Sequence, residues 1–225
     1  MRLYEAVPDG PIRGGLVVIQ EAFGVNEYIE DVTRRGAEAG YHSVAPDLFH
    51  RSGGGTVPYG QFDKVMEHFQ AVKGDADVIN DVDAALEHLR GAGFADGQIG
   101  IVGFCFGGRV TFLTALKHAI GAAVGFYGGG IVSGRFPQFP PLIDEVASLQ
   151  TPWLGLFGDQ DGSIPVEDVE RLRAALPAAN VDTDIVRYPE AGHGFHCDRR
   201  PDYRPDDAKD AWGRALRFLD EHIAG

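Results

Sequence analysis

Short hydrophobic runs with the character of β-strands alternate with amphipathic stretches along this chain. The runs occupy residues 14–20, 41–47, 99–102, 121–128, 153–158 and 182–188. The run at 99–102 is rich in β-branched residues, and the continuous apolar run at 14–20 is typical of a strand buried on both faces of a parallel sheet. Apolar residues at helical spacing occupy residues 28–39, 62–69, 75–89, 110–116, 166–176 and 207–223. The alternation predicts one α/β domain over residues 1–225, a mostly parallel sheet with helices on both faces.

Two segments interrupt this alternation. Residues 50–59 are rich in glycine and are expected to form a loop with freedom to move. The sequence leaves open whether residues 50–62 close over a site as a lid. Residues 128–150 form an irregular stretch rich in Gly and Pro. Neither segment has the composition of a linker between domains, so both are expected to be excursions from one sheet.

The strongest chemical signal lies where the strand at 99–102 passes into the helix at 110–116. Between them, Gly103-Phe104-Cys105-Phe106-Gly107 has a nucleophilic side chain with a glycine two residues to either side. This is the pattern of a nucleophile elbow, here with Cys in place of the more usual Ser. The turn is so sharp that a Cβ at either glycine would collide with neighbouring backbone. The helix N-terminus favours negative charge and therefore the thiolate, although a buried structural cysteine is the alternative reading.

Two further reactive groups follow Cys105 at predicted strand ends. Asp161 lies on the loop after one buried strand, and His193 lies between glycines after the last. Each alone is more often an ordinary loop residue. Nucleophile, acid and then histidine is, however, the chain order of the α/β-hydrolase triad, which favours a Cys105–His193–Asp161 triad. Glu21, directly after the first buried strand, is either a functional carboxylate or a solvent-facing one.

Composition excludes several classes of protein. The net charge of −13 argues against a nucleic-acid partner. No apolar run reaches the length of a membrane span, and the first residues lack a signal-peptide core, so a cytoplasmic protein is expected.

Metal and disulfide sites are not expected either. The two cysteines, Cys105 and Cys197, do not form a disulfide framework, and no Cys/His cluster has zinc-site spacing. The aspartates at positions 75, 77, 81 and 83 are interpreted as a solvated helix face, because no calcium-loop pattern accompanies them. We therefore expect neither a metal nor a cofactor.

The chain resembles the dienelactone hydrolases (carboxymethylenebutenolidases) of the α/β-hydrolase superfamily. The resemblance rests on five blocks spread from the first buried strand to the last. They are Gln20–Asn26, Ala45–Leu48, Gly103–Gly108, Gln160-Asp161 ahead of Ile164-Pro165, and Glu190–Phe195. It implies the α/β-hydrolase fold and a cofactor-free hydrolase of small esters or lactones.

The resemblance also assigns roles to residues. Cys105 would attack the carbonyl, His193 would shuttle the proton, and Asp161 would fix the imidazole tautomer. Glu21 would interact with the resting thiol and help to take its proton. The backbone N–H groups of Ala22 and Phe106 would hold the oxyanion. The candidate substrate-binding residues are Arg199, Arg200, Phe23 and Tyr127.

The sequence departs from the family pattern at the positions that bind the substrate. The best-known members hold an anionic lactone with arginines, one of them a few residues after the histidine. Here Cys197 stands near that position, and Arg51 is the only arginine in the other expected region, at its start. Arg199 and Arg200 could supply the cationic patch, or could be a solvated pair.

Other functions stay open. The same triad would suit acyl transfer or thioester cleavage, and a non-catalytic redox-sensing or binding domain would use Cys105 as an oxidation reporter. The expected partner is a small-molecule ester or lactone, with no nucleic acid and no membrane. The chain would be a monomer or a small homo-oligomer, and the role of Cys197 is left open.

Overall fold

A single seven-stranded sheet forms the centre of the computed structural model, which describes residues 1–134 and 136–223. The strand order is β1-β3-β2-β4-β5-β6-β7. β1 pairs antiparallel with β3, and every other neighbouring pair is parallel. The strands are β1 (Leu3–Ala6), β2 (Gly14–Ile19), β3 (Tyr41–Pro46), β4 (Ile99–Phe104), β5 (Ala122–Phe126), β6 (Trp153–Gly158) and β7 (Thr183–Tyr188). The predicted mostly parallel sheet is confirmed, and the sequence missed only the short, partly exposed β1.

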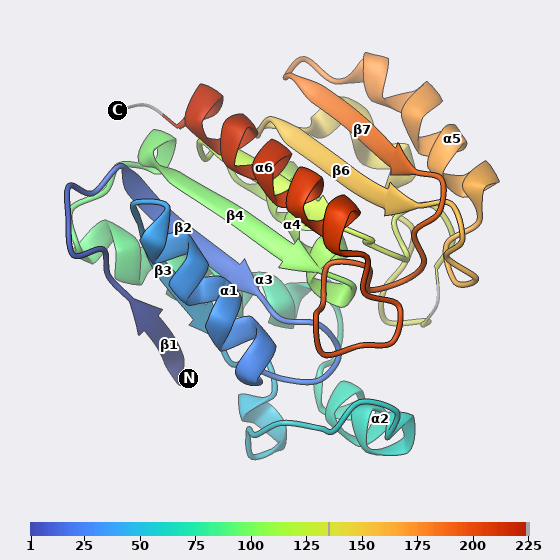
Figure 1. Ribbon diagram of the computed structural model, residues 1–225, viewed down its shortest axis with the longest axis horizontal. Coiled ribbons are helices and arrows are strands. Elements are labelled where there is room, and N and C mark those ends of the chain that lie inside the picture. Colours follow the sequence, from blue (N-terminus) through green and yellow to red (C-terminus); the bar gives the residue numbers. More distant parts are fainter. Residues whose placement is uncertain (135, 224–225) are drawn as a thin grey trace.

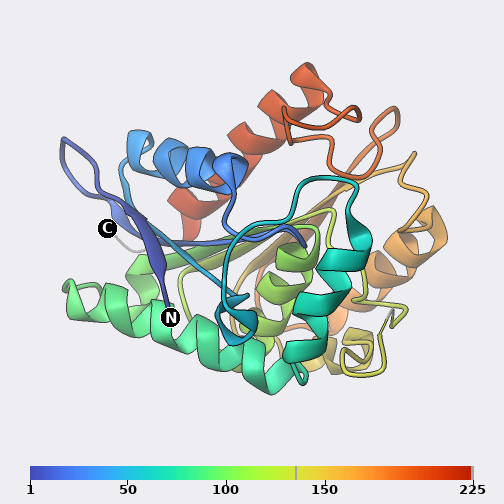
Figure 2. The same ribbon diagram turned by 90° about the horizontal axis from the view of Figure 1, so that it is seen from below.

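Helices cover both faces of this sheet. The α-helices are α1 (Glu27–Glu38), α2 (Phe62–Ala71), α3 (Asp75–Gly91), α4 (Phe106–Lys117), α5 (Val166–Ala175) and α6 (Pro205–His222). Short 3-10 helices occur at η1 (His50–Ser52), η2 (Asp96–Gln98), η3 (Ile143–Ser148) and η4 (Leu176–Ala178). α1 and α6 lie on one face, and α3 and α4 lie on the other (Figures 1 and 2). α2 stands apart from both layers, below the carboxyl ends of the central strands in Figure 1.

The central strands fix where the functional loops begin. Every residue of β2, β4, β5 and β6 is buried, as their continuous apolar runs predict. Ile19 pairs with Gly103, and Phe104 pairs with Phe126. The chain therefore leaves β2 and β4 side by side, which places Glu21 and Cys105 at the same edge of the sheet.

The acidic residues of α3 depart from the prediction of a solvated face. Asp81 is only 4% exposed and accepts hydrogen bonds from Arg51 and from His50 Nε2 (2.9 Å). Asp75 accepts two hydrogen bonds, at 2.6 and 3.0 Å, from the buried guanidinium of Arg109. The prediction was wrong for these two carboxylates because their cationic partners come from segments distant in the sequence. Arg51 is consequently held by α3.

None of the helices in residues 1–134 and 136–223 combines the length and the apolar character that a membrane crossing requires.

Candidate active site

Cys105 occupies the sharp turn between β4 and α4. Its φ of 54° is positive, a conformation that is costly for a residue with a Cβ and that persists only where the surroundings impose it. A Cβ at Gly107 would lie 2.5 Å from the carbonyl oxygen of Ile19, and one at Gly103 would collide with the Gly107 backbone. The glycines therefore have the steric role that the sequence predicted, and the cysteine caps the N-terminus of α4.

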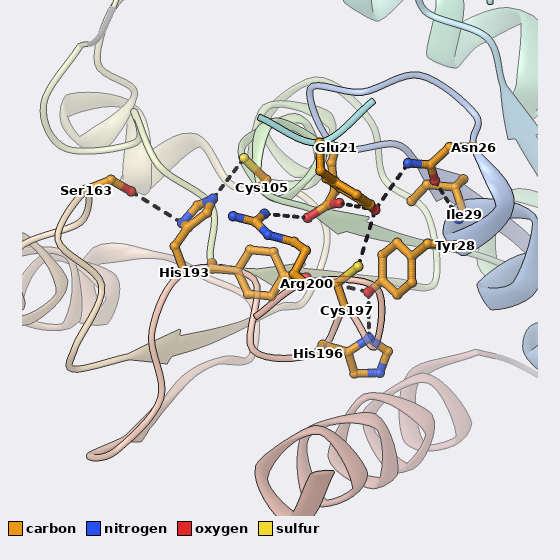
Figure 3. Close-up of polar contacts among 12 residues, drawn as sticks. Glu21, Asn26, Tyr28, Ile29, Cys105, Ser163, His193, His196, Cys197 and Arg200 are labelled. Atoms are coloured by element: carbon orange, nitrogen blue, oxygen red, sulfur yellow. Dashed lines mark hydrogen bonds and ion pairs between the residues drawn. The ribbon is translucent and has the colours of Figure 1, made fainter. Parts of the chain in front are cut away.

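The structure brings Cys105, His193 and Asp161 together in one hydrogen-bonded row. His193 Nε2 lies 3.0 Å from Cys105 Sγ, and His193 Nδ1 lies 2.6 Å from Asp161 Oδ2. Figure 3 shows the imidazole of His193 between Cys105 and the β6–α5 loop, which carries Ser163. Because both ring nitrogens are engaged, the imidazole is oriented toward the sulfur by the aspartate.

Asp161 is held as an ionised carboxylate. Its Oδ1 accepts hydrogen bonds from Ser163 Oγ (2.6 Å) and from the backbone N–H groups of Ser163 (2.8 Å) and Ile164 (3.2 Å). Burial by itself would raise the pKa of Asp161, but the hydrogen bonds from His193 and Ser163 outweigh it and lower that pKa. The sequence analysis missed Ser163, although a serine two residues after an aspartate is a familiar sign of a turn that bonds its own carboxylate.

The charge on His193 follows from the same row. Burial lowers the pKa of this imidazole, but the negative charge of the Cys105 sulfur and the hydrogen bond to Asp161 raise it to about 10. The arrangement therefore favours the imidazolium form of His193, which can donate its Nε2 proton to an oxygen atom of a substrate.

Glu21 forms a second polar cluster beside this row. It is fully buried, and it accepts hydrogen bonds from Arg200 Nη1 (3.2 Å) and Tyr59 OH (3.2 Å). Burial raises the pKa of Glu21, and the nearby charges of Arg200 and His193 only partly oppose this. Figure 3 shows the Arg200 side chain extending between His193 and Glu21. Glu21 is thus no solvent-facing carboxylate.

Tyr59 is a site residue that the sequence analysis missed. Its hydroxyl bonds Glu21, lies 3.3 Å from Cys197 Sγ and accepts a hydrogen bond from Asn26 Nδ2 (3.1 Å). The glycine-rich segment 50–59 brings it there, and a hydrogen bond from Val57 N to the carbonyl oxygen of Phe23 anchors that segment to the site. No composition signal distinguished this tyrosine, because its partners come from two other segments, Gln20–Asn26 and the loop that carries Cys197.

Cys197 is buried within this second cluster. Burial, followed by the negative charge of Glu21, raises its pKa to about 11, so it remains a neutral thiol at neutral pH. The two cysteines of the chain consequently have different environments: Cys105 contacts an imidazole, and Cys197 contacts a phenol.

The two residues predicted for the oxyanion hole, Ala22 and Phe106, both line the cavity that contains Cys105. Among the residues that the structure describes, neither backbone N–H group donates to a protein acceptor. Both amides are therefore free to donate to an oxygen atom of a substrate.

This cavity has a volume of about 420 Å³. Its lining consists of Ala22, Phe23, Phe62, Val65, Met66, Phe69, Cys105, Phe106, Arg109, Gly129, Gly130, Phe136, Phe139, Asp161, Gly162, Ser163, His193 and Arg200. Most of these residues are apolar, and the triad lies at one side. Phe69 was not predicted as a site residue because it has the spacing of an ordinary helix core position, and Phe136 and Phe139 were not because they lie in the irregular stretch 128–150.

Two of the four predicted substrate-binding residues lie elsewhere. The Arg199 side chain is 57% exposed and pairs with Asp198 at 3.7 Å, whereas the neighbouring Arg200 reaches the cavity. Tyr127 is completely buried, and its ring packs edge-on against the His193 ring at 5.2 Å between centroids. Tyr127 therefore supports the imidazole from behind, and Phe23 and Arg200 are the two that line the cavity.

One cluster among the described residues has the composition of a metal site. Ligand atoms of Glu5, His42 and His88 lie within 4.8 Å of one another. Glu5 Oε1 receives hydrogen bonds from both imidazoles, at 2.6 and 2.8 Å, which accounts for the cluster without an ion. None of these residues lines the cavity that contains Cys105.

Comparison with known proteins finds relatives of this chain over nearly its whole length. The model of the dienelactone hydrolase family matches residues 1–223. A relative from Methylorubrum extorquens, named "Putative carboxymethylenebutenolidase", is 42% identical over 216 residues, covering 94% of this chain and 73% of the relative. The "Carboxymethylenebutenolidase" of Pseudomonas putida is 31% identical over 208 residues, covering 91% and 84%.

A solved structure gives the same result for the fold. The crystal structure of a "Putative Dienelactone Hydrolase" from Klebsiella pneumoniae superposes with a TM-score of 0.84 at 37% identity, covering 96% of this chain and 91% of that one.

Proposed function

The chain belongs to the dienelactone hydrolase family and is a carboxylic ester hydrolase, and we propose that it cleaves small esters or lactones through a Cys105–His193–Asp161 triad and an acyl-enzyme intermediate. One observation carries the proposal: His193 contacts Cys105 Sγ at 3.0 Å and Asp161 at 2.6 Å on the wall of a cavity of about 420 Å³. A nucleophile, a proton carrier and an orienting carboxylate are the groups that acyl transfer requires.

In the acylation step the Cys105 thiolate attacks the carbonyl carbon and forms a C–S bond. The carbonyl oxygen becomes an oxyanion and accepts hydrogen bonds from the backbone N–H groups of Ala22 and Phe106. As the intermediate collapses, the bond to the leaving oxygen breaks, and the His193 imidazolium gives its Nε2 proton to that oxygen. The products of this step are an alcohol and a thioester on Cys105.

In the deacylation step neutral His193 takes a proton from water, which attacks the thioester carbonyl. The same two amides hold the second oxyanion, and the C–S bond then breaks. The carboxylic acid leaves, the sulfur becomes a thiolate again, and the proton taken from water stays on His193. Asp161 stays ionised throughout and keeps Nδ1–H in place.

Glu21 is proposed to act on the thiol in the resting enzyme. Burial raises the pKa of this carboxyl and so makes it a better proton acceptor than an exposed one. Arg200 and Tyr59 donate hydrogen bonds to its ionised form, so where the sulfur is still a thiol the carboxylate can take the Sγ proton before the first acylation and release it to water.

The test compares wild type with Cys105→Ala on an activated acetate ester. We expect the substitution to lower kcat/KM by about a thousandfold or more, with an unchanged circular dichroism spectrum. Mass spectrometry should find an acetyl adduct on Cys105 in wild type and none in the variant, which still contains Cys197. Undiminished turnover by a folded variant would refute the proposal.

A further inference from the structure

We propose that the acyl group of the natural substrate is uncharged and aromatic, or otherwise bulky and apolar, and that it binds against α2 and the phenylalanines facing it. This inference rests on the proposed function and specifies its substrate class. The acyl group stays attached to Cys105 until water releases it. It is therefore the part of the substrate that occupies the cavity through both chemical steps.

The first observation is a continuous aromatic wall centred on Phe69. Its ring lies 4.8 Å from that of Phe106 and 5.7 Å from that of Phe136, measured between centroids. Phe106 in turn lies 5.1 Å from Phe139. Phe106 follows the nucleophile directly, so the wall begins at the reacting sulfur. A substrate ring that packs edge-to-face or offset-stacked on the cavity side of these rings gains the favourable energy of an aromatic pair.

The second observation is that α2 also carries exposed apolar side chains at the rim of the same cavity. Phe62 is 60% exposed and Met66 is 36% exposed, and both line the cavity from α2. Their helix neighbours Val65 and Phe69 are buried. Apolar side chains clustered at the rim of a cavity mark a surface that a ligand covers. α2 therefore packs Val65 and Phe69 against the protein, while Phe62 and Met66 remain available for contact with the substrate.

The third observation concerns charge. Among the described residues that line the cavity, the arginines are Arg109 and Arg200, and each already has a carboxylate partner. Arg109 binds Asp75 with both terminal nitrogens and also donates to the carbonyl oxygens of Gly130 and Pro140. Arg200 binds the fully buried Glu21.

A substrate carboxylate would have to compete for these arginines. If it took Arg200, Glu21 would be left as a buried charge without its cation, which is costly. With Arg109 paired to Asp75 and Arg200 paired to Glu21, the charges left at the site are those of Asp161 and of the proposed Cys105 thiolate, which the His193 imidazolium only partly balances. A neutral apolar acyl group avoids this repulsion and gains free energy by covering the aromatic wall.

The test uses three trifluoroethyl esters that share one leaving group. Their acyl groups are 3-phenylpropanoyl, 4-oxopentanoyl and succinyl, the last of these with a free carboxylate. The 4-oxopentanoyl and succinyl groups are similar in size but different in charge. For wild type, kcat/KM is corrected for the reactivity of each ester with hydroxide. We expect the corrected kcat/KM to fall from the phenylpropanoyl to the oxopentanoyl to the succinyl ester, about tenfold at each step.

Two lysine variants of α2 locate the effect. Met66→Lys adds a cation at the cavity rim, and Gln70→Lys adds the same charge at an exposed position of α2 outside the cavity lining. Met66→Lys should raise the ratio of succinyl to oxopentanoyl turnover about tenfold and lower phenylpropanoyl turnover. Gln70→Lys should leave all three ratios at their wild-type values.

The outcomes separate the two proposals. If wild type cleaves the esters but prefers the succinate half-ester, or if both lysine variants shift the ratios equally, the substrate class is wrong and the hydrolase proposal stands. If no ester is cleaved and Cys105 gains no acyl adduct, the proposed function fails, and this inference fails with it.

Discussion

Asp161 and Glu21 are two buried carboxylates that follow strands at the same edge of the sheet, and their environments shift their pKa values in opposite directions. Asp161 receives a hydrogen bond from His193 and three from Ser163 and Ile164. Glu21 receives one from Tyr59 and one from Arg200. Burial favours the neutral form of both carboxyls, but the pKa of Asp161 is lowered and that of Glu21 is raised.

The difference teaches that burial does not decide the role of a carboxylate; the donors that surround it do. A carboxylate with four donors stays ionised and orients its histidine. A carboxylate with two donors in a fully desolvated position has a raised pKa and is better suited to accept a proton. The two residues are therefore suited to different steps of one reaction.

The largest effect on activity is expected from substitutions of Asp161. Asp161→Ala should lower kcat/KM about a hundredfold or more, because His193 loses both its orientation and its counter-charge. Asp161→Asn should lose less than the alanine variant, since its amide oxygen can still accept the Nδ1–H hydrogen bond of an imidazolium. Steady-state kinetics on one activated ester checks both. Equal activities of wild type and Asp161→Ala would contradict the triad.

A smaller effect is expected from Glu21, which contacts neither Cys105 nor His193 through a hydrogen bond among the described residues. Glu21→Gln keeps the size of the side chain and removes its ability to take a proton. We expect kcat/KM to fall about tenfold, with a changed pH profile below neutrality. The matched variant Tyr59→Phe removes a donor to Glu21 and keeps the base. A Glu21→Gln profile parallel to that of wild type would show that this carboxyl is only structural.

The smallest effect is expected in stability, where the two carboxylates should have opposite pH dependences. The lowered pKa of Asp161 stabilises the fold above its ordinary value of 3.8, and this contribution is lost as the pH falls through the folded value. The raised pKa of Glu21 makes the wild type lose stability as the pH rises from 4.5 toward the folded value.

Urea unfolding of wild type, Asp161→Asn and Glu21→Gln at several pH values measures both slopes. With rising pH, the free energy of unfolding of wild type should increase relative to Asp161→Asn and decrease relative to Glu21→Gln. If both free-energy differences changed with pH in the same direction, the opposite pKa shifts of Asp161 and Glu21 would be contradicted.

Much of the fold could be predicted from local pattern. The buried runs that became β2, β4, β5 and β6 are continuous and apolar, and the helix over residues 62–69 has clear apolar spacing. β1 could not be predicted in this way, because four residues with a partly exposed pattern carry too little signal. The candidate triad could also be proposed, since a glycine-flanked elbow and the order of three reactive residues are properties of the chain itself.

What only the tertiary structure decided is which side chains share a space. Arg199 and Arg200 are adjacent and chemically identical in the sequence, yet the fold sends one into solvent and the other to Glu21. Asp75 has the sequence pattern of a solvated helix residue, but in the structure it forms an ion pair with Arg109 of α4. Periodicity reports whether a position faces the interior, because burial is set by the local element. The partner that a side chain meets there is set by long-range packing, and no local pattern encodes it.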